Sequence, residues 1–363
     1  MATGRRTRMR SLPAIAWSLA AALSLAASAA SSTERLRLDD GHLQVEVAPV
    51  LGGRIVHVSL PGRPNLLKVG EAVATQPDPV PAADGDNIPY FGHELWTGPQ
   101  SGWWLDQDVN PARRAAAAQW PPDPWLANAR NRVVEQAPGH LALEGVASPV
   151  SGLQVRQSFR LPPDAPGTLE LTAEAVNARD REVRRDLWFN TRLPAGSRVF
   201  APVAGPEHAR LRADVDDTYA GPVAWWRDGL YSLQLDPPPA GKTGRRGKIF
   251  IAPSAGWIAG FGAGQLLLIR FERQADEAID PEHGQVELYL DWHHDDPAAG
   301  VLELEVHAPM RTLAPGEAMQ ARETWTVLPY DGPDELEAQR AALESALRDP
   351  GPGDQLQDPA YPL

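Results

Sequence analysis

The sequence contains no cysteine among its 363 residues. It therefore offers no residue for a disulfide, for a thiolate-bound metal ion or for a lipid-modified cysteine. Three other motifs are also missing: the glycine-rich phosphate loop, the nucleophile elbow of hydrolases and the paired-histidine zinc motif of metalloprotease helices. We predict no cofactor and no metal site from these absences.

Positive charge is scarce. The chain has 34 Lys and Arg against 47 Asp and Glu, a formal net charge of −13. Removal of the first thirty residues would take four arginines and no acid, so the charge would become −13 − 4 = −17. Such a chain is poorly suited to nucleic acid or to anionic membranes, which bind clustered Lys and Arg. A local basic patch is still compatible with an acidic sugar.

The only long apolar run is at the N-terminus, where Leu12 to Leu25 follows Arg5, Arg6, Arg8 and Arg10. This run is shorter than the roughly 20 residues that span a membrane. Small residues follow it, as at a signal-peptidase site. We predict a signal peptide over residues 1–30, cut near Ala29 or Ala30, a periplasmic or secreted protein, and no membrane anchor.

Apolar and polar residues alternate with a period of two through most of the chain. Examples are the segments 43–47, 153–160, 169–172 and 302–307, each followed or preceded by short turn-rich connections. Alternation of this kind is typical of strands with one face in the core and the other in water. The sequence therefore predicts an all-β protein of antiparallel sheets packed face to face.

Few segments depart from this alternation. Residues 71–89 and 236–248 are rich in Pro, Gly, Asp or Ala and are predicted to be surface loops. Residues 334–347, within a C-terminal segment 333–350, show the thin apolar stripe of a helix. We predict one domain over residues 31–332, followed by this helix and by a disordered tail at 351–363.

The aromatic segment, Phe91–Trp125, contains five tryptophans together with a histidine and several carboxylates. It is too short to bury five indoles in itself, so the rings must lie on another surface or line a cleft. Sugar rings stack their C–H groups on indoles while their hydroxyls bind polar groups at the rim. The segment therefore predicts a carbohydrate ligand, with Trp104 and Trp120 as the rings expected in the cleft.

Several short motifs occur in a characteristic order. They are Val50-Leu51-Gly52-Gly53-Arg54-Ile55, then Trp120-Pro121-Pro122-Asp123-Pro124, and near the end Ala308-Pro309 and Leu313-Ala314-Pro315-Gly316-Glu317. In this order the chain resembles the galactose mutarotase-like superfamily, and most of all a bacterial domain of unknown function within it. The resemblance covers about 36–329 and implies the large antiparallel supersandwich of the aldose 1-epimerases, followed here by the C-terminal helix.

The resemblance also implies candidate catalytic residues. Aldose epimerases use a Glu in a Glu-Thr-Gln motif as base, and the nearest match here is Glu272. Their acid is the His of a His-x-Tyr-Phe-Asn strand, which corresponds to Asp186 in Asp186-Leu187-Trp188-Phe189-Asn190. This departure from the epimerase pattern leaves His93 or Asp186 as the partner of Glu272.

Seven further residues are predicted to bind substrate because they lie in the resembling motifs, in the aromatic segment or on polar strand faces: Arg54, Glu94, Trp96, Trp104, Trp120, Trp188 and Glu287. The run from Asp291 to Asp296 contains two adjacent histidines. Neighbouring residues of an extended chain point to opposite faces, so we interpret this run as a polar hairpin loop.

The sequence leaves open whether the protein is an enzyme. The leading hypothesis is a periplasmic carbohydrate-binding protein of mutarotase-like fold, with acid/base chemistry at a sugar anomeric centre like that of an aldose 1-epimerase. One alternative is a non-catalytic protein that recognises envelope polysaccharide, and another is a polysaccharide lyase or hydrolase on the same scaffold. The expected partner is a sugar or oligosaccharide, and the expected state is a monomer or weak dimer.

Overall fold

The computed structural model describes Met1, residues 32–296 and residues 298–348. Apart from Met1, the predicted signal peptide over 1–30 lies outside the described residues, and so does the predicted tail over 351–363. The account below concerns the unit that begins at Ser32.

The first of two large sheets has the order β1-β2-β3-β4-β10-β20-β19-β16-β12, and β13 also pairs with β16. Its pairs are antiparallel except for β13 with β16. Its strands are β1 (Leu36–Asp39), β2 (Gln44–Ala48), β3 (Arg54–Ser59), β4 (His93–Trp96), β10 (Trp188–Pro194), β12 (Ala209–Ala213), β13 (Tyr219–Ala220), β16 (Gly244–Ile251), β19 (Val286–His293) and β20 (Val301–His307).

The second sheet has the order β14-β15-β11-β17-β18-β22-β8-β7-β6-β5 and is antiparallel throughout. A short pair, β21 with β9, lies apart from both sheets. The strands are β5 (Arg132–Ala137), β6 (His140–Glu144), β7 (Leu153–Arg160), β8 (Thr168–Asn177), β9 (Val183–Arg185), β11 (Arg198–Pro202), β14 (Val223–Arg227), β15 (Leu230–Gln234), β17 (Trp257–Gly262), β18 (Gln265–Phe271), β21 (Arg311–Leu313) and β22 (Ala318–Pro329).

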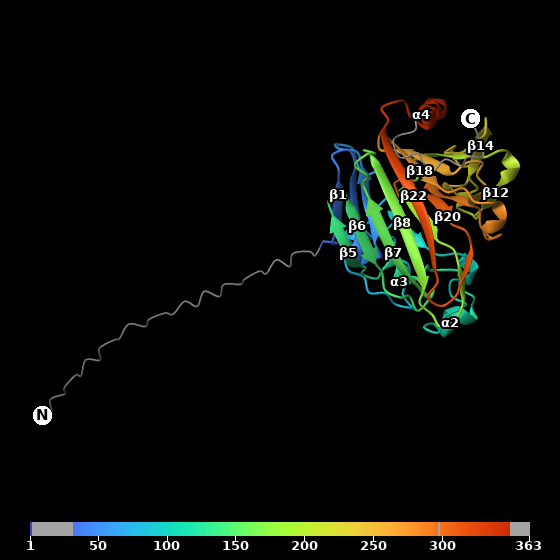
Figure 1. The fold of residues 1–363 in the computed structure, drawn as a ribbon. Coiled ribbons are helices and arrows are strands. Elements are labelled where there is room, and N and C mark those ends of the chain that lie inside the picture. The colour runs from blue at the N-terminus through green and yellow to red at the C-terminus, as the bar shows by residue number, and fades with distance from the viewer. Residues whose placement is uncertain (2–31, 297, 349–363) are drawn as a thin grey trace. The chain divides into compact units, whose positions relative to one another are not determined.

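The main core contains the apolar residues of both sheets. Alternation along each strand supplies these residues, because every second side chain points to the same face. In β20, for example, Leu302, Leu304 and Val306 belong to this core. The two packed antiparallel sheets confirm the predicted all-β supersandwich (Figure 1).

The helices do not belong to either sheet. In Figure 1, α2 and α3 lie at the bottom and α4 at the top. The α-helices are α1 (Ala72–Thr75), α2 (Pro111–Ala115), α3 (Pro124–Ala127) and α4 (Leu336–Arg348), and the 3-10 helices are η1 (Pro49–Leu51), η2 (Gln100–Gly102), η3 (Pro206–His208) and η4 (Asp276–Ala278). None of the helices in the described part is long and apolar enough to cross a membrane.

The predicted C-terminal helix is present as α4. Its buried Leu343 packs with Phe200, Phe261 and other apolar residues of the second sheet in a cluster separate from the main core. Helix α4 therefore covers part of the outer face of the second sheet.

One predicted loop is wrong in its second half. The sequence predicts a surface loop over residues 236–248, but β16 begins at Gly244 and contains Arg245 and Lys248, both buried. The Gly, Arg and Lys residues of this segment are typical of a surface loop, so the sequence does not indicate a strand. In the structure the side chains of Arg245 and Lys248 bind partners inside the protein instead of water. Arg245 donates to the backbone oxygens of Asp236 and Gly221, both at 2.7 Å.

Candidate functional site

One face of the first sheet lies in the core, and the opposite face carries polar and aromatic side chains. On β10, for example, Phe189 and Leu193 belong to the core, while Trp188 and Asn190 alternate with them and point the other way. We call this opposite side the polar face. It includes Arg54, Glu94, Trp96, Trp188, Asn190, Arg192, Lys248, Glu287, Glu303, Glu305 and His307.

The strand registers align the centre of the polar face in a row. Asn190 lies opposite Glu94 on one side and Glu305 on the other, and Glu305 lies opposite Glu287. Asn190 is fully buried, yet neither its side-chain oxygen nor its side-chain nitrogen has a hydrogen-bond partner among the described residues. Buried polar groups nearly always have partners. An amide with two unused hydrogen-bonding ends is therefore an unusual feature at the centre of the sheet.

Glu94, at one end of this row, belongs to a network in which positive and negative charges are equal in number. Glu94 accepts hydrogen bonds from Arg54 and from Arg192, the second at 2.5 Å, and Arg192 also binds Glu303 at 2.9 Å. Two arginines therefore face two glutamates. Burial raises the pKa of Glu94, but the two guanidinium groups outweigh that effect and hold its pKa below the usual range.

A second charge cluster lies across Asn190. The Nζ of Lys248 contacts Oε2 of Glu287 at 2.5 Å and Oε2 of Glu305 at 2.9 Å. Burial raises the pKa of Glu305, and Lys248 offsets this only in part. The pKa of Glu287 is instead lowered despite its burial, because Lys248 and the neighbouring His307 both stabilise its charge.

His307 is held by a carboxylate behind it. Its Nδ1 lies 2.9 Å from Oδ2 of Asp186, and its Nε2 lies 3.6 Å from Oε1 of Glu287. Asp186 also accepts a hydrogen bond from the backbone N–H of Gly98. A Cβ on Gly98 would lie 2.5 Å from Oδ1 of Asp186, so only glycine allows this close approach. Burial lowers the pKa of His307, but Asp186 and Glu287 together raise it to about 9.

Indole rings cover this cluster. The ring of Trp188 lies 4.5 Å from that of His307, and the Nζ of Lys248 lies 4.6 Å from its centroid. Trp96 meets Trp188 edge to face at 4.9 Å and Trp120 at 6.2 Å. Trp120 is 52% exposed, whereas Trp96 and Trp188 are buried. The rings therefore extend from the buried charges to the protein surface.

The aromatic segment is fixed by local capping. The side chain of Asn110 accepts from the N–H of Arg113 and begins α2, and Asp123 accepts from the N–H of Trp125 and begins α3. Asp123 also accepts from the hydroxyl of Ser148 at 2.5 Å. These contacts attach the segment to the chain between β6 and β7.

The structure brings six of the ten predicted site residues to the polar face or directly behind it. Five of them, Arg54, Glu94, Trp96, Trp188 and Glu287, belong to the face itself. Asp186 lies behind His307, so it acts on the face through the imidazole. Trp120 lies at the exposed rim.

The other three predicted residues lie elsewhere. Glu272 is exposed just beyond the end of β18. His93 points into the core, where it contacts Thr191 at 2.9 Å and the ring of Trp325 at 4.9 Å, and burial lowers its pKa to about 3. Trp104 is fully buried, and its Nε1 donates to the carbonyl of Pro121 at 2.7 Å. The structure therefore does not bring Glu272 and His93 together, and Trp104 supports the segment from inside.

Sequence reasoning did not select Lys248, Asn190, Arg192, Glu305 or His307. The alternation places Glu303, Glu305 and His307 on one face of a strand, and it predicts that this face lies in water. A strand pattern separates two faces without showing what covers the polar one. The signal available was the density of charged residues on β19 and β20.

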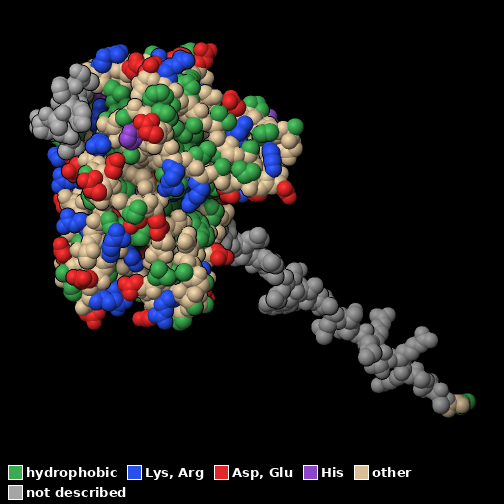
Figure 2. All heavy atoms as spheres, turned by 90° about the vertical axis from the view of Figure 1, so that its right-hand side faces the viewer, with side chains coloured by type: hydrophobic (Ala, Val, Ile, Leu, Met, Phe, Trp, Pro, Cys, Tyr) green, Lys and Arg blue, Asp and Glu red, His purple; other side chains and the backbone are tan. Residues whose placement is uncertain are grey.

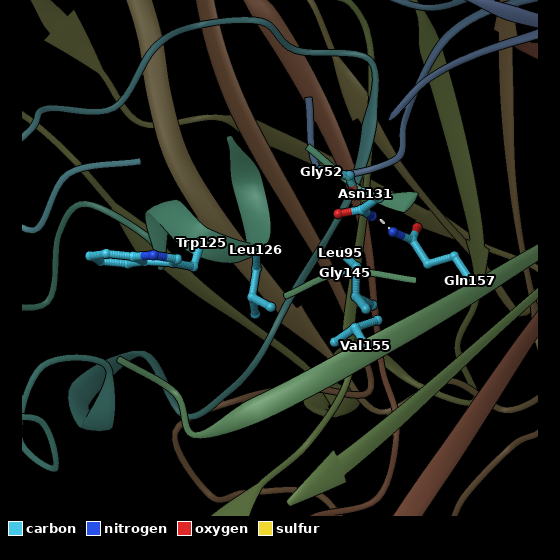
Figure 3. Close-up of a pocket in the computed structure, with 8 residues that line it drawn as sticks. All are labelled: Gly52, Leu95, Trp125, Leu126, Asn131, Gly145, Val155 and Gln157. Carbon is cyan, nitrogen blue, oxygen red and sulfur yellow. Dashed lines mark hydrogen bonds between the residues drawn. The ribbon is translucent and has the colours of Figure 1, made fainter. Parts of the chain in front are cut away.

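A narrow pocket elsewhere is shown in Figure 3. It lies between the end of the aromatic segment and β7, with Trp125 and Leu126 on one side and Gln157 on the other. The Nε2 of Gln157 donates to the carbonyl of Gly52 at 2.8 Å, so this polar end is already satisfied. The pocket carries no charged side chain and is separate from the polar face.

Comparison with known proteins identifies the family. The sequence profile of one family matches residues 33–328. The chain belongs to DUF4380, a domain of unknown function. The DUF4380 match covers both sheets and ends before α4. No curated protein matches the sequence.

Solved structures show the fold of this DUF4380 chain. The Slr1438 protein of Synechocystis sp. PCC 6803 has a TM-score of 0.52 and 11% identity, over 82% of this chain and 97% of that one. A galactose mutarotase-like protein of Lactobacillus casei ATCC 334 has a TM-score of 0.50 and 10% identity, over 81% and 100%. A candidate aldose 1-epimerase of Klebsiella pneumoniae subsp. pneumoniae MGH 78578 has a TM-score of 0.51 and 16% identity, over 85% and 81%. The galactose mutarotase-like fold is therefore confirmed.

Proposed function

We propose that this protein binds a carbohydrate on the polar face of its first sheet. The observation that carries the proposal is Asn190, whose amide has both ends unused between Glu94 and Glu305. The indole N–H groups of Trp96 and Trp188 also lack partners within the described chain. Indole faces beside unused donors and acceptors match the alternating C–H and hydroxyl groups of a sugar.

We propose that a ligand reaches the polar face past Trp120. Asn190, Glu287 and Glu305 are fully buried, whereas Trp120 and part of Glu303 reach solvent. The proposal therefore includes an outward movement of the aromatic segment when the sugar enters. Such a movement would change the surroundings of several tryptophans at once.

The binding test is a titration of intrinsic tryptophan fluorescence and of heat with a panel of monosaccharides and oligosaccharides. Wild type is expected to respond to at least one sugar. Trp120→Ala is expected to weaken binding by about 2- to 10-fold, because stacking on one indole contributes about 0.5–1.5 kcal/mol. Trp226→Ala is the matched control, since Trp226 is 41% exposed on β14 of the other sheet. No response to any sugar would remove the proposal.

The chemistry proposed for this site is proton transfer at a sugar anomeric centre, as in aldose 1-epimerases. Glu305 is the proposed proton acceptor, because it lies beside Asn190 and its Oε1 has no partner in the described part of the chain. Exchange between anomers, followed by NMR, tests this step. Glu305→Gln is expected to lower the rate by about 10²- to 10⁴-fold. Glu272→Gln is the control and is expected to leave the rate unchanged.

A second candidate is non-catalytic recognition of an envelope polysaccharide. The complete burial of Glu287, Glu305 and His307 favours it, because a catalytic group must reach the reacting atoms. Sugar binding without anomer exchange, in wild type and in Glu305→Gln alike, would select this candidate over the epimerase.

We also propose that the protein acts outside the cytoplasm, in the periplasm or as a secreted protein. The support is the basic and then apolar N-terminal sequence that ends in small residues near Ala29. A sugar-binding face on an exported protein fits ligands of the cell envelope or of the medium.

A further inference from the structure

Two histidines and a glutamate converge on the polar face where β19 begins and β20 ends. Ligand atoms of His283, Glu287 and His307 all lie within 4.8 Å of one another. The Nδ1 of His283 lies 2.9 Å from Oε1 of Glu287, and the Nε2 of His307 lies 3.6 Å from the same oxygen. The side chains are 4%, 0% and 0% exposed respectively.

Each of the two imidazoles has one ring nitrogen without a hydrogen bond in the described part of the chain. The Nε2 atoms of His283 and His307 are both buried and have no hydrogen-bond partner among the described residues. Asp186 occupies Nδ1 of His307 and thereby leaves Nε2 directed toward Glu287. A carboxylate behind an imidazole is the usual arrangement around histidines that bind metal ions, where it fixes the ring and the tautomer.

The local charge also favours a cation. The second charge cluster contains the carboxylates of Asp186, Glu287 and Glu305 and one fixed cation, Lys248. The neighbouring network of Arg54, Arg192, Glu94 and Glu303 is balanced. Within the described residues of this cluster, the three buried carboxylates outnumber the single lysine, and the two histidines lie beside them. Lys248 contacts Oε2 of Glu287, whereas both imidazoles approach Oε1.

The backbone before β19 is built for this convergence. A turn in which the N–H of His283 bonds the carbonyl of Asp280 at 2.8 Å turns the chain back toward β16. Gly284 follows, and its N–H donates to Oε1 of Glu287 at 3.1 Å. A Cβ on Gly284 would lie 2.5 Å from the backbone nitrogen of Ile251. Only glycine therefore allows His283 to sit this close to the strands.

We propose that His283, Glu287 and His307 form a binding site for one divalent transition-metal ion, with Asp186 as the positioning residue behind His307. Two imidazoles and a carboxylate are a donor set that zinc takes readily, with a further position left for water or a ligand oxygen. The inference concerns metal binding in the absence of sugar and does not depend on the proposed function.

The experiment uses the full chain, stripped with chelator and then titrated with zinc chloride. Wild type is expected to bind one zinc ion per chain by calorimetry and by metal analysis after desalting. His283→Gln and His307→Gln are each expected to lower the affinity by about 100-fold or more, and Asp186→Asn by about 10- to 100-fold. Equal zinc binding in wild type and in the His283→Gln/His307→Gln double variant would overturn the site.

His293→Gln is the matched control. His293 also lies beside a carboxylate, with its Nε2 3.3 Å from Oδ1 of Asp291. The sequence predicts a polar loop from Asp291 onward, but β19 continues to His293. Substitution of His293 is expected to leave zinc affinity and stoichiometry unchanged. A loss of binding in His293→Gln, with binding kept in His307→Gln, would transfer the site to residues 291–295 and refute the proposal.

A measurement on wild type alone covers the case in which a variant fails to fold. X-ray absorption of the zinc-loaded protein counts imidazole ligands directly. Two imidazoles and oxygen ligands are expected. A spectrum without imidazole scattering, or no bound zinc at micromolar concentrations, would refute the proposed site.

Discussion

Glu323 shows what a single buried carboxylate does to the protein. It lies on β22 and is 1% exposed; its Oε2 accepts from Nε1 of Trp325 at 2.8 Å, and Oε1 has no partner in the described region. Burial raises the pKa of Glu323 to about 8. The folded protein therefore holds a proton at Glu323 at a pH at which the unfolded chain has lost it.

The expected consequence is a loss of stability as pH rises. Between the ordinary pKa of 4.5 and about 8, the folded state binds more protons than the unfolded state. The contribution of this group to the free energy of unfolding therefore falls by up to about 1.4 kcal/mol per pH unit and levels off above pH 8. Glu323→Gln removes this slope. The free energy of unfolding of the variant should therefore rise relative to that of wild type from pH 5 to pH 8. Urea unfolding of both proteins at several pH values measures it, and parallel profiles would contradict it.

Glu94 is the residue on which two buried arginines depend. Glu94→Ala removes the carboxylate that Arg54 binds and leaves Arg192 with Glu303. The substitution is expected to lower the free energy of unfolding by about 3–5 kcal/mol, because it leaves a buried charge unpaired. Glu144→Ala is the control, because its pair with Arg132 is largely in solvent and should contribute less than about 1 kcal/mol. Chemical denaturation measures both. Similar losses would mean that the network is solvated.

At the scale of single residues, the sequence predicted several residues of the polar face, but it did not predict every carboxylate that lies there. Arg54, Glu94, Trp96 and Trp188 lie on the polar face, and their binding role stays a prediction. Glu272 does not lie there, because the end of an apolar strand can lie either in a cleft or in water, and the strand pattern is the same for both. Only the strand registers show that Glu305 lies next to Asn190.

At the scale of elements, α4 stabilises the second sheet from outside. Leu343 is fully buried against apolar residues that include Phe200 and Leu268. Leu343→Ala is therefore expected to cost about 2–5 kcal/mol. Ser345→Ala, on the exposed side of α4, should change the free energy of unfolding by less than about 0.5 kcal/mol. Thermal or urea unfolding compares the two variants. If Leu343→Ala leaves the free energy of unfolding unchanged, α4 is not docked on the sheet in solution.

The positions of most strands along the chain could be predicted, because alternation is a local pattern. The order of the strands within each sheet could not be predicted from it. Strand β4 lies between β3 and β10, although more than ninety residues separate Glu94 from Arg192 along the chain. Strand β16 was hidden because its polar residues are satisfied by tertiary contacts. Lys248 is the clearest example, since its two carboxylate partners come from β19 and β20.

At the scale of the whole molecule, the N-terminal sequence predicts processing. Protein expressed from the full sequence in a bacterium is expected to begin near Ala30 and to be recovered from the periplasm or the medium. Intact mass and N-terminal sequencing of the purified protein measure the cleavage site. Replacing the four arginines Arg5, Arg6, Arg8 and Arg10 by glutamate should retain the uncut chain in the cytoplasm. Full-length, uncut protein from the unaltered sequence would contradict this prediction.

The two sheets end in strands β1, β12, β14 and β5, and an open sheet edge invites pairing with another chain. Each of these strands carries an exposed arginine: Arg37, Arg212, Arg227 and Arg132. Around β12 and β14, acidic and basic side chains are interspersed on the surface (Figure 2). Pairing two such edges would remove water from these charged side chains, which costs free energy. We therefore expect the charged borders of the sandwich to disfavour pairing of its open edges with those of a neighbouring copy.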